Sequence, residues 1–114
     1  MKKFFLLTLL LLLSPVTPSA AAPTGQQLLN ACEVAAKKGF KGTESFLCEW
    51  YATPCDCEAD RPAEAPRVCL PRNYDIRELT QLVMTGLRQE PELRREHAAT
   101  AAAIILARSY PCKE

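Results

Sequence analysis

The sequence has few of the residues that build catalytic and nucleic-acid-binding sites. Its 114 residues include a single histidine, His97, in the charged run 94–97, so no Ser/His/Asp set is indicated and a solvated helix face is expected there. Its four glycines form no phosphate-binding loop. Its 14 basic and 13 acidic residues are interspersed, which argues against nucleic acid as a partner. These absences favour a protein that binds another protein over an enzyme.

No apolar run is long enough to anchor the chain in a membrane. The longest run of large apolar residues, 4–13, follows two lysines and is shorter than the roughly 20 residues that a spanning helix needs. Small residues follow it, with a small-x-small cleavage site ending at Ala21 and no cysteine there for lipid attachment. We therefore expect a signal peptide over 1–21, export to the periplasm, and one mature domain over 22–114.

Cysteine is the residue type that the mature part has in abundance. An even number of cysteines in an exported chain is typical of a disulfide framework. A zinc site is disfavoured because the closest pair is C-x-C and the only histidine is remote in sequence. We expect no metal and no cofactor. The six cysteines are Cys32, Cys48, Cys55, Cys57, Cys69 and Cys112.

Helix signals in the first half of the mature chain predict a helical hairpin. Thr24 opens a T-x-x-Q capping box, and Gly39 suits the left-handed position after a helix end. A second helix is expected from Thr43 and should stop at Pro54, because proline lacks an amide donor. Its expected apolar face consists of four residues: Phe46, Leu47, Trp50 and Tyr51.

The second half predicts another hairpin. A third helix should begin near Asp75, and Pro91 fits the first position of a fourth helix that ends around Tyr110. Apolar residues recur at helical spacing in both segments. The fold class expected is therefore all-α: a small disulfide-stapled bundle of about four helices arranged as two helical hairpins.

The hairpins also predict the cysteine pairing. Residues equidistant from the connecting loop lie side by side in an antiparallel hairpin, and two cysteine pairs are placed in this way about residue 40 and about the break at 90–91. These pairs are Cys32–Cys48 and Cys69–Cys112. Cys55 and Cys57 are left to pair with each other, to pair between chains, or to act as a redox-active pair.

The segment 55–67 is acidic and contains two prolines, which predicts an exposed loop. Held by cysteines and prolines, it is our candidate contact surface for a partner, and a solvated connector is the alternative interpretation. An exposed Trp50 would add an aromatic anchor beside it. The candidate contact residues are Asp56, Glu58, Asp60, Glu64 and Trp50.

Several short motifs together resemble the Rap/Tai-like family of immunity proteins, which protect bacteria against peptidoglycan amidases delivered by type VI secretion. The motifs span about residues 26–112 and are L-L-x-x-C at 28–32, F-x-C-x-x-Y at 46–51, C-L-P at 69–71, Pro91-Glu92 and Y-P-C at 110–112. The resemblance implies a helical periplasmic protein that binds an amidase effector and blocks it.

Three functional hypotheses follow. The first is an immunity protein that occludes a toxin's active site. The second is an envelope structural or chaperone-like protein without a toxin partner, suggested by Trp50 and Pro54 where the family usually carries glycines. The third is a thiol-redox protein that uses the C-x-C pair. A homodimer is left open for each.

Overall fold

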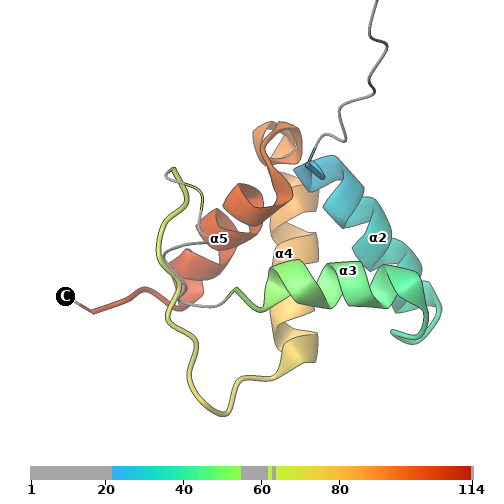
Figure 1. The fold of residues 1–114 in the computed structure, drawn as a ribbon, viewed down its shortest axis with the longest axis horizontal. Helices are drawn as coiled ribbons and strands as arrows, with labels where there is room; N and C mark the ends of the chain where they lie inside the picture. The colour runs from blue at the N-terminus through green and yellow to red at the C-terminus, as the bar shows by residue number, and fades with distance from the viewer. Residues whose placement is uncertain (1–21, 55–61, 63, 114) are drawn as a thin grey trace, which may run out of the picture.

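The computed structural model describes residues 22–54, 62 and 64–113, and this part of the chain is helical (Figure 1). It contains no strand within these ranges, only two isolated antiparallel bridges. The predicted signal peptide, Cys55, Cys57 and the loop residues Asp56, Glu58 and Asp60 lie outside the described residues. The elements are α2 (Gly25–Lys37), α3 (Thr43–Ala52), α4 (Ile76–Gln89), the 3-10 helix η1 (Pro91–Arg95) and α5 (Ala98–Ser109).

Both ends of α2 form as the sequence predicts. The Thr24 hydroxyl accepts a hydrogen bond from the Gln27 amide at 3.2 Å, and the Gln27 side chain accepts one from the Thr24 amide at 2.8 Å. At the other end Gly39 is left-handed, with φ of 68°. Phe40 is also left-handed, and its amide donates to the Ala35 carbonyl at 2.7 Å. This bond closes the helix end as a Schellman motif.

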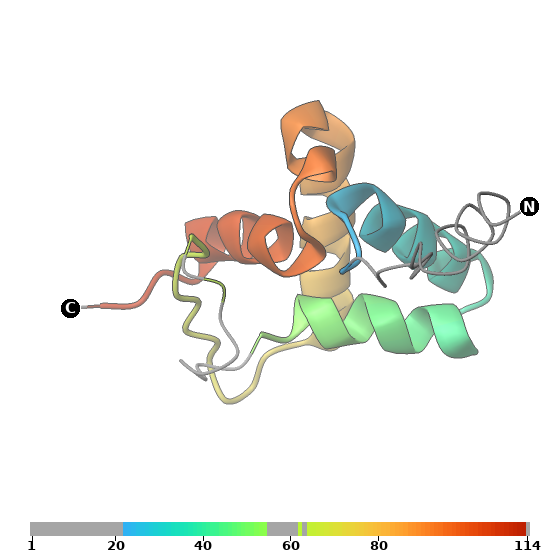
Figure 2. The same ribbon diagram turned by 45° about the horizontal axis from the view of Figure 1, so that its top comes forward.

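The first predicted disulfide joins α2 to α3. Cys32 and Cys48 are bonded, their Cα atoms are 4.9 Å apart, and both side chains are fully buried. Figures 1 and 2 show α2 and α3 lying side by side, so the expected first hairpin is confirmed.

The predicted apolar face of α3 is wrong in part. The helix turns its small side chains Ser45, Cys48 and Ala52 inward, and short side chains let two helix backbones approach closely. The larger apolar residues are displaced from this contact to the flank or to the outside of the helix. Leu47 and Tyr51 are half-buried, whereas Phe46 is 68% and Trp50 65% exposed.

α4 begins where the sequence indicates. The Asp75 carboxylate accepts a hydrogen bond from the Arg77 amide at 3.0 Å, which caps the first turn. Leu79, Val83 and Leu87 recur at helical spacing and are fully buried. α4 therefore supplies the central apolar stripe, against which α2, α3 and α5 pack.

The prediction that the fourth helix begins at Pro91 is wrong. Pro91 opens the short 3-10 helix η1, and α5 begins only at Ala98. Residues 96–97 are not helical because the backbone of residues 96–98 hydrogen-bonds to the chain at the start of α2. The Gly25 amide donates to the Glu96 carbonyl at 2.8 Å, and the Ala98 amide donates to the Pro23 carbonyl at 2.9 Å.

The second predicted disulfide closes the other hairpin. Cys69 and Cys112 are bonded, with their Cα atoms 5.0 Å apart. Val68 forms a bridge with Pro111, and the Cys69 amide donates to the Tyr110 carbonyl at 3.0 Å. Residues 68–69 therefore run beside the chain that follows α5, and the segment then continues to the start of α4, as Figures 1 and 2 show.

The all-α, disulfide-stapled bundle expected from the sequence is thus confirmed for the described residues. None of the helices in these ranges has the length and apolar content needed to cross a membrane.

Candidate functional site

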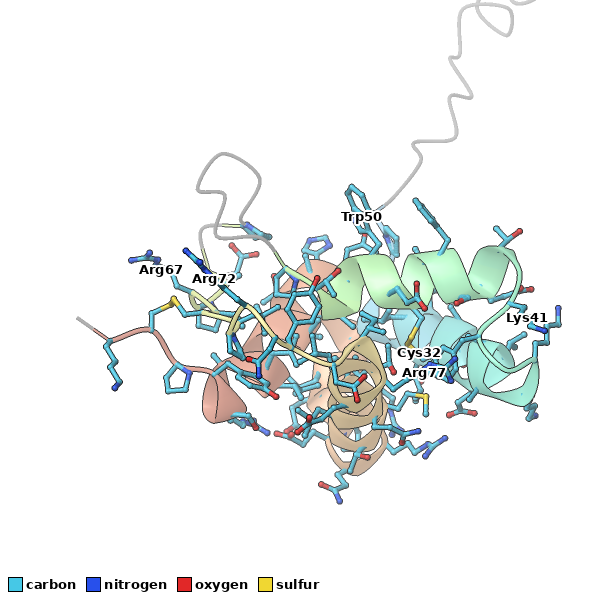
Figure 3. All side chains as sticks on the ribbon, turned by 90° about the horizontal axis from the view of Figure 1, so that it is seen from below. Cys32, Lys41, Trp50, Arg67, Arg72 and Arg77 are labelled. Atoms are coloured by element: carbon cyan, nitrogen blue, oxygen red, sulfur yellow. A yellow bond between two sulfur atoms is a disulfide. The ribbon has the colours of Figure 1, made fainter. Side chains whose placement is uncertain are left out.

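The most distinctive surface feature is a pair of exposed aromatic rings on α3. Phe46 and Trp50 lie one helical turn apart, so their side chains share one face. Their ring centroids are 6.0 Å apart and the rings are inclined by 29°. Figure 3 shows Trp50 projecting outward from α3, while Cys32 lies beneath the helix toward the core. Two stacked, solvent-exposed rings in so small a domain are typical of a binding surface.

The rings form one side of a groove of about 330 Å³. The opposite side comes from the segment that enters α4, where Tyr74 is 44% exposed and Ile76 is half-buried. The Asp75 cap between these two residues fixes the direction in which α4 starts. Because α3 and α4 pack on each other in the core, both sides of the groove rest on well-defined helices.

Two polar residues lie in the groove, Glu49 and Thr53. The Thr53 hydroxyl is used locally, since it donates to the Glu49 carbonyl at 2.7 Å. Glu49 is half-buried, and its carboxylate accepts one hydrogen bond, from the Ser45 hydroxyl at 3.2 Å, whose single proton is shared with the Phe40 carbonyl at 3.0 Å. In the described part of the chain no ion pair involves Glu49. The groove therefore presents a carboxylate that has no cationic partner among the described residues.

The neighbouring charges are engaged elsewhere or lie off the groove. A hydrogen bond with its own backbone amide and the nearby Lys38 keep the pKa of Glu44 below its ordinary value, and Lys38 Nζ lies 3.5 Å from that carboxylate. The guanidinium of Arg77 lies 4.0 Å from the centroid of the Phe40 ring. Arg67 and Arg72 project beyond the end of α3, and neither lines the groove (Figure 3).

The described residues gather no catalytic set around this groove. His97 is exposed at the N-cap of α5 rather than on a helix face, and it does not line the groove. No group of three or more His, Cys, Asp or Glu residues within 22–54, 62 and 64–113 could hold a metal ion. The four cysteines of these ranges are all in disulfides.

Of the residues proposed from the sequence as partner contacts, the structure places one in the groove. Trp50 lines it, whereas Glu64 is exposed on the segment that leads to Cys69. The other three acidic residues are outside the described ranges. The remaining members of the groove were not predicted as contact residues. These are Phe46, which was expected on the apolar face of the second helix, and Glu49, Thr53, Tyr74 and Ile76.

One sequence signal could have revealed this arrangement. Ser45, Cys48 and Ala52 lie at helical spacing, and one of them is a predicted disulfide cysteine that must face α2. The face opposite a disulfide points away from the partner helix, and on α3 that face carries Phe46 and Trp50. Fixing the rotation of α3 by its cysteine would thus have exposed the rings.

Comparison with known proteins gives one match. A family model described as Rap1a immunity proteins matches residues 24–112. No curated protein and no solved structure matches the chain. The matched range covers all the described helices and both disulfides.

Proposed function

Because the chain belongs to the Rap1a immunity protein family, we propose that it is a periplasmic immunity protein that neutralises a peptidoglycan amidase delivered by type VI secretion. The family assignment by itself supports a more general function, which is immunity to a secreted toxin. The amidase target and the periplasmic site of binding are our proposal. The protein acts by binding and blocking the toxin's active site, without chemistry of its own.

The observation that carries this proposal is the exposed ring pair on α3. Tryptophan and tyrosine are enriched among the residues that dominate protein–protein binding energy, because they bury a large area at little entropic cost. Phe46 and Trp50 stand out of a domain whose other large apolar side chains are mostly buried. The groove beside them would receive a projection of the toxin.

Export is supported by the two disulfides. Structural disulfides form and persist in oxidising compartments, and both pairs here tie helical segments that would otherwise be held by a small core. A peptidoglycan-cleaving toxin also acts outside the cytoplasmic membrane. An immunity protein against it therefore has to be exported to meet it.

We retain the acidic loop as a second part of the contact surface. Its candidate residues are Asp56, Glu58, Asp60 and Glu64, of which Glu64 is described and exposed. The loop connects the end of α3, where the groove lies, to the segment held by Cys69. Because residues 55–67 follow α3 closely in the chain, a toxin seated on the aromatic groove would be expected to contact them as well.

The test is protection from the toxin in the periplasm. A cysteine amidase encoded beside this protein is directed to the periplasm of a sensitive strain, and lysis is followed with and without this protein. We expect protection by the full chain and none by a variant lacking residues 1–21, which stays in the cytoplasm. Lysis in the presence of the exported full chain would contradict the proposal.

The exposed rings also favour a second candidate, a chaperone-like envelope protein without a toxin partner. Such a protein would use Phe46 and Trp50 to hold apolar segments of unfolded clients. It should suppress the aggregation of unrelated unfolded proteins at comparable concentrations. An immunity protein should instead bind one folded amidase and leave such aggregation unchanged.

A further inference from the structure

We propose that the α3 groove receives a cationic side chain, an arginine or a lysine, from the protein that it binds. This inference rests on the proposed function, because it names the chemistry by which the toxin would be recognised. The occupant is a basic projection of the folded partner, and charge complementarity identifies it.

The groove combines the two features that bind a cation in a protein. Aromatic rings attract a cation through the negative potential of their faces, most strongly for tryptophan. Trp50, Phe46 and Tyr74 provide the rings, and Glu49 provides the opposite charge. A guanidinium in the groove would be able to lie against a ring face and donate to the carboxylate at once.

The state of Glu49 disfavours an apolar or an acidic occupant. Covering the groove with a purely apolar surface would remove water from a carboxylate that has one hydrogen bond, from Ser45, and no ionic partner among the described residues. Burying an unpaired charge is costly. An acidic projection would add repulsion from the same carboxylate. A cation removes both problems, since it replaces the lost water and neutralises the charge.

A contact between a cation and an aromatic ring is already present within the chain. The guanidinium of Arg77 lies over the Phe40 ring at 4.0 Å from its centroid. That contact packs a basic side chain of α4 against an aromatic ring at the end of α2. The groove offers a cationic side chain the same kind of ring contact, with the Glu49 carboxylate in addition.

The first experiment uses the only tryptophan of the chain as reporter. The indole N–H signal of Trp50 is followed by NMR while the peptide acetyl-Gly-Arg-Gly-amide is added at constant ionic strength. A second titration uses the citrulline peptide, which has nearly the same shape and no charge. We expect a saturable shift with the arginine peptide and about tenfold weaker binding with citrulline, the ratio that a cation–π contact with a charge partner supports.

Two carboxylate variants test the role of Glu49. Glu49→Gln should weaken binding of the arginine peptide about tenfold and leave binding of the citrulline peptide unchanged. Glu92→Gln removes an exposed carboxylate on η1, outside the groove, and should change neither. Equal binding of both peptides, no shift with either, or no effect of Glu49→Gln would each overturn the inference.

A second experiment separates this inference from the proposed function. The affinity of the wild type, Glu49→Gln and Glu92→Gln is measured for the cysteine amidase that is encoded beside this protein. Weaker binding only of Glu49→Gln supports both proposals. If the amidase binds all three equally, the cation site is wrong and the immunity function stands. If no amidase binds but the arginine peptide requires Glu49, the cation site stands and the immunity function fails.

Discussion

At the scale of the residue, Trp50 is expected to contribute much to partner affinity and little to the stability of the fold. Its side chain is 65% exposed and stacks only on Phe46, so Trp50→Ala should change the free energy of unfolding by no more than about 0.5 kcal/mol. It should lower the affinity for the partner by about 2 kcal/mol or more, as truncation of a central aromatic anchor does. Urea melts and calorimetric titration measure the two quantities. Gln81→Ala on the exposed side of α4 is the control, and a Trp50→Ala variant that binds like the wild type would contradict this role.

Glu90 and Arg108 provide a pH-dependent contact at the same scale. Two hydrogen bonds, at 2.5 and 2.8 Å, join the carboxylate at the end of α4 to the guanidinium near the end of α5. The hydrogen bonds from Arg108 lower the pKa of Glu90 from its ordinary value of 4.5. The pair therefore stabilises the fold above pH 4.5, and this contribution is lost as the pH falls through the lowered pKa.

The variant Arg108→Gln tests this contact. Because the Arg108 side chain is 55% exposed, the loss of stability at pH 7 should be small and should diminish in high salt. Urea midpoints at pH 7, 5 and 3 should show the difference from the wild type shrinking toward pH 3. Arg95→Gln on η1 is the control. A difference that is the same at all three pH values would show that the ion pair is not its cause.

At the scale of the element, Gly25 fixes how α2 meets η1. A Cβ atom at this position would collide with the carbonyl oxygen of Leu93 and approach the Cα of Arg94. Both are backbone atoms, so the elements would have to separate and strain the bond from Gly25 to the Glu96 carbonyl. We expect Gly25→Ala to lower the free energy of unfolding by about 1–3 kcal/mol. Urea melts measure it, with the exposed Gln26→Ala as control. Equal stability of Gly25→Ala and the wild type would contradict the close contact.

The elements also show which features a sequence can predict. The helix starts at Thr24 and Asp75 were predictable because each depends on a side chain bonding within its own turn. Both described disulfides were predictable because residues equidistant from the loop of a helical hairpin lie side by side. The start of α5 was not predictable, because Glu96 pairs with Gly25, far away in the chain.

The candidate site was predictable only through Trp50. Aromatic residues normally favour burial, which placed Phe46 in the core. The rotation of α3 is instead set by close packing of its small residues on α2, a tertiary effect. Tyr74 and Glu49 join the site because α4 crosses near α3, and nothing local to either residue indicates that meeting.

At the scale of the whole molecule, the two described disulfides differ in accessibility. Cys32 and Cys48 are fully buried, whereas Cys69 is exposed near the C-terminus. Thiol exchange needs access to a sulfur, so mild dithiothreitol treatment of the folded protein should reduce Cys69–Cys112 first. Alkylation and peptide mapping at intervals should label Cys112 before Cys48. Simultaneous labelling of the two pairs would mean that reduction proceeds through global unfolding.

At this scale we propose that the protein is a specific inhibitor of one secreted peptidoglycan amidase. The most direct test of this proposal is a calorimetric titration of the purified exported protein against each peptidoglycan hydrolase encoded in the same genome. We expect one cysteine amidase to bind with a dissociation constant on the order of nanomolar and to lose its cleavage of peptidoglycan in the complex. Binding to none of these hydrolases would contradict the proposed inhibition.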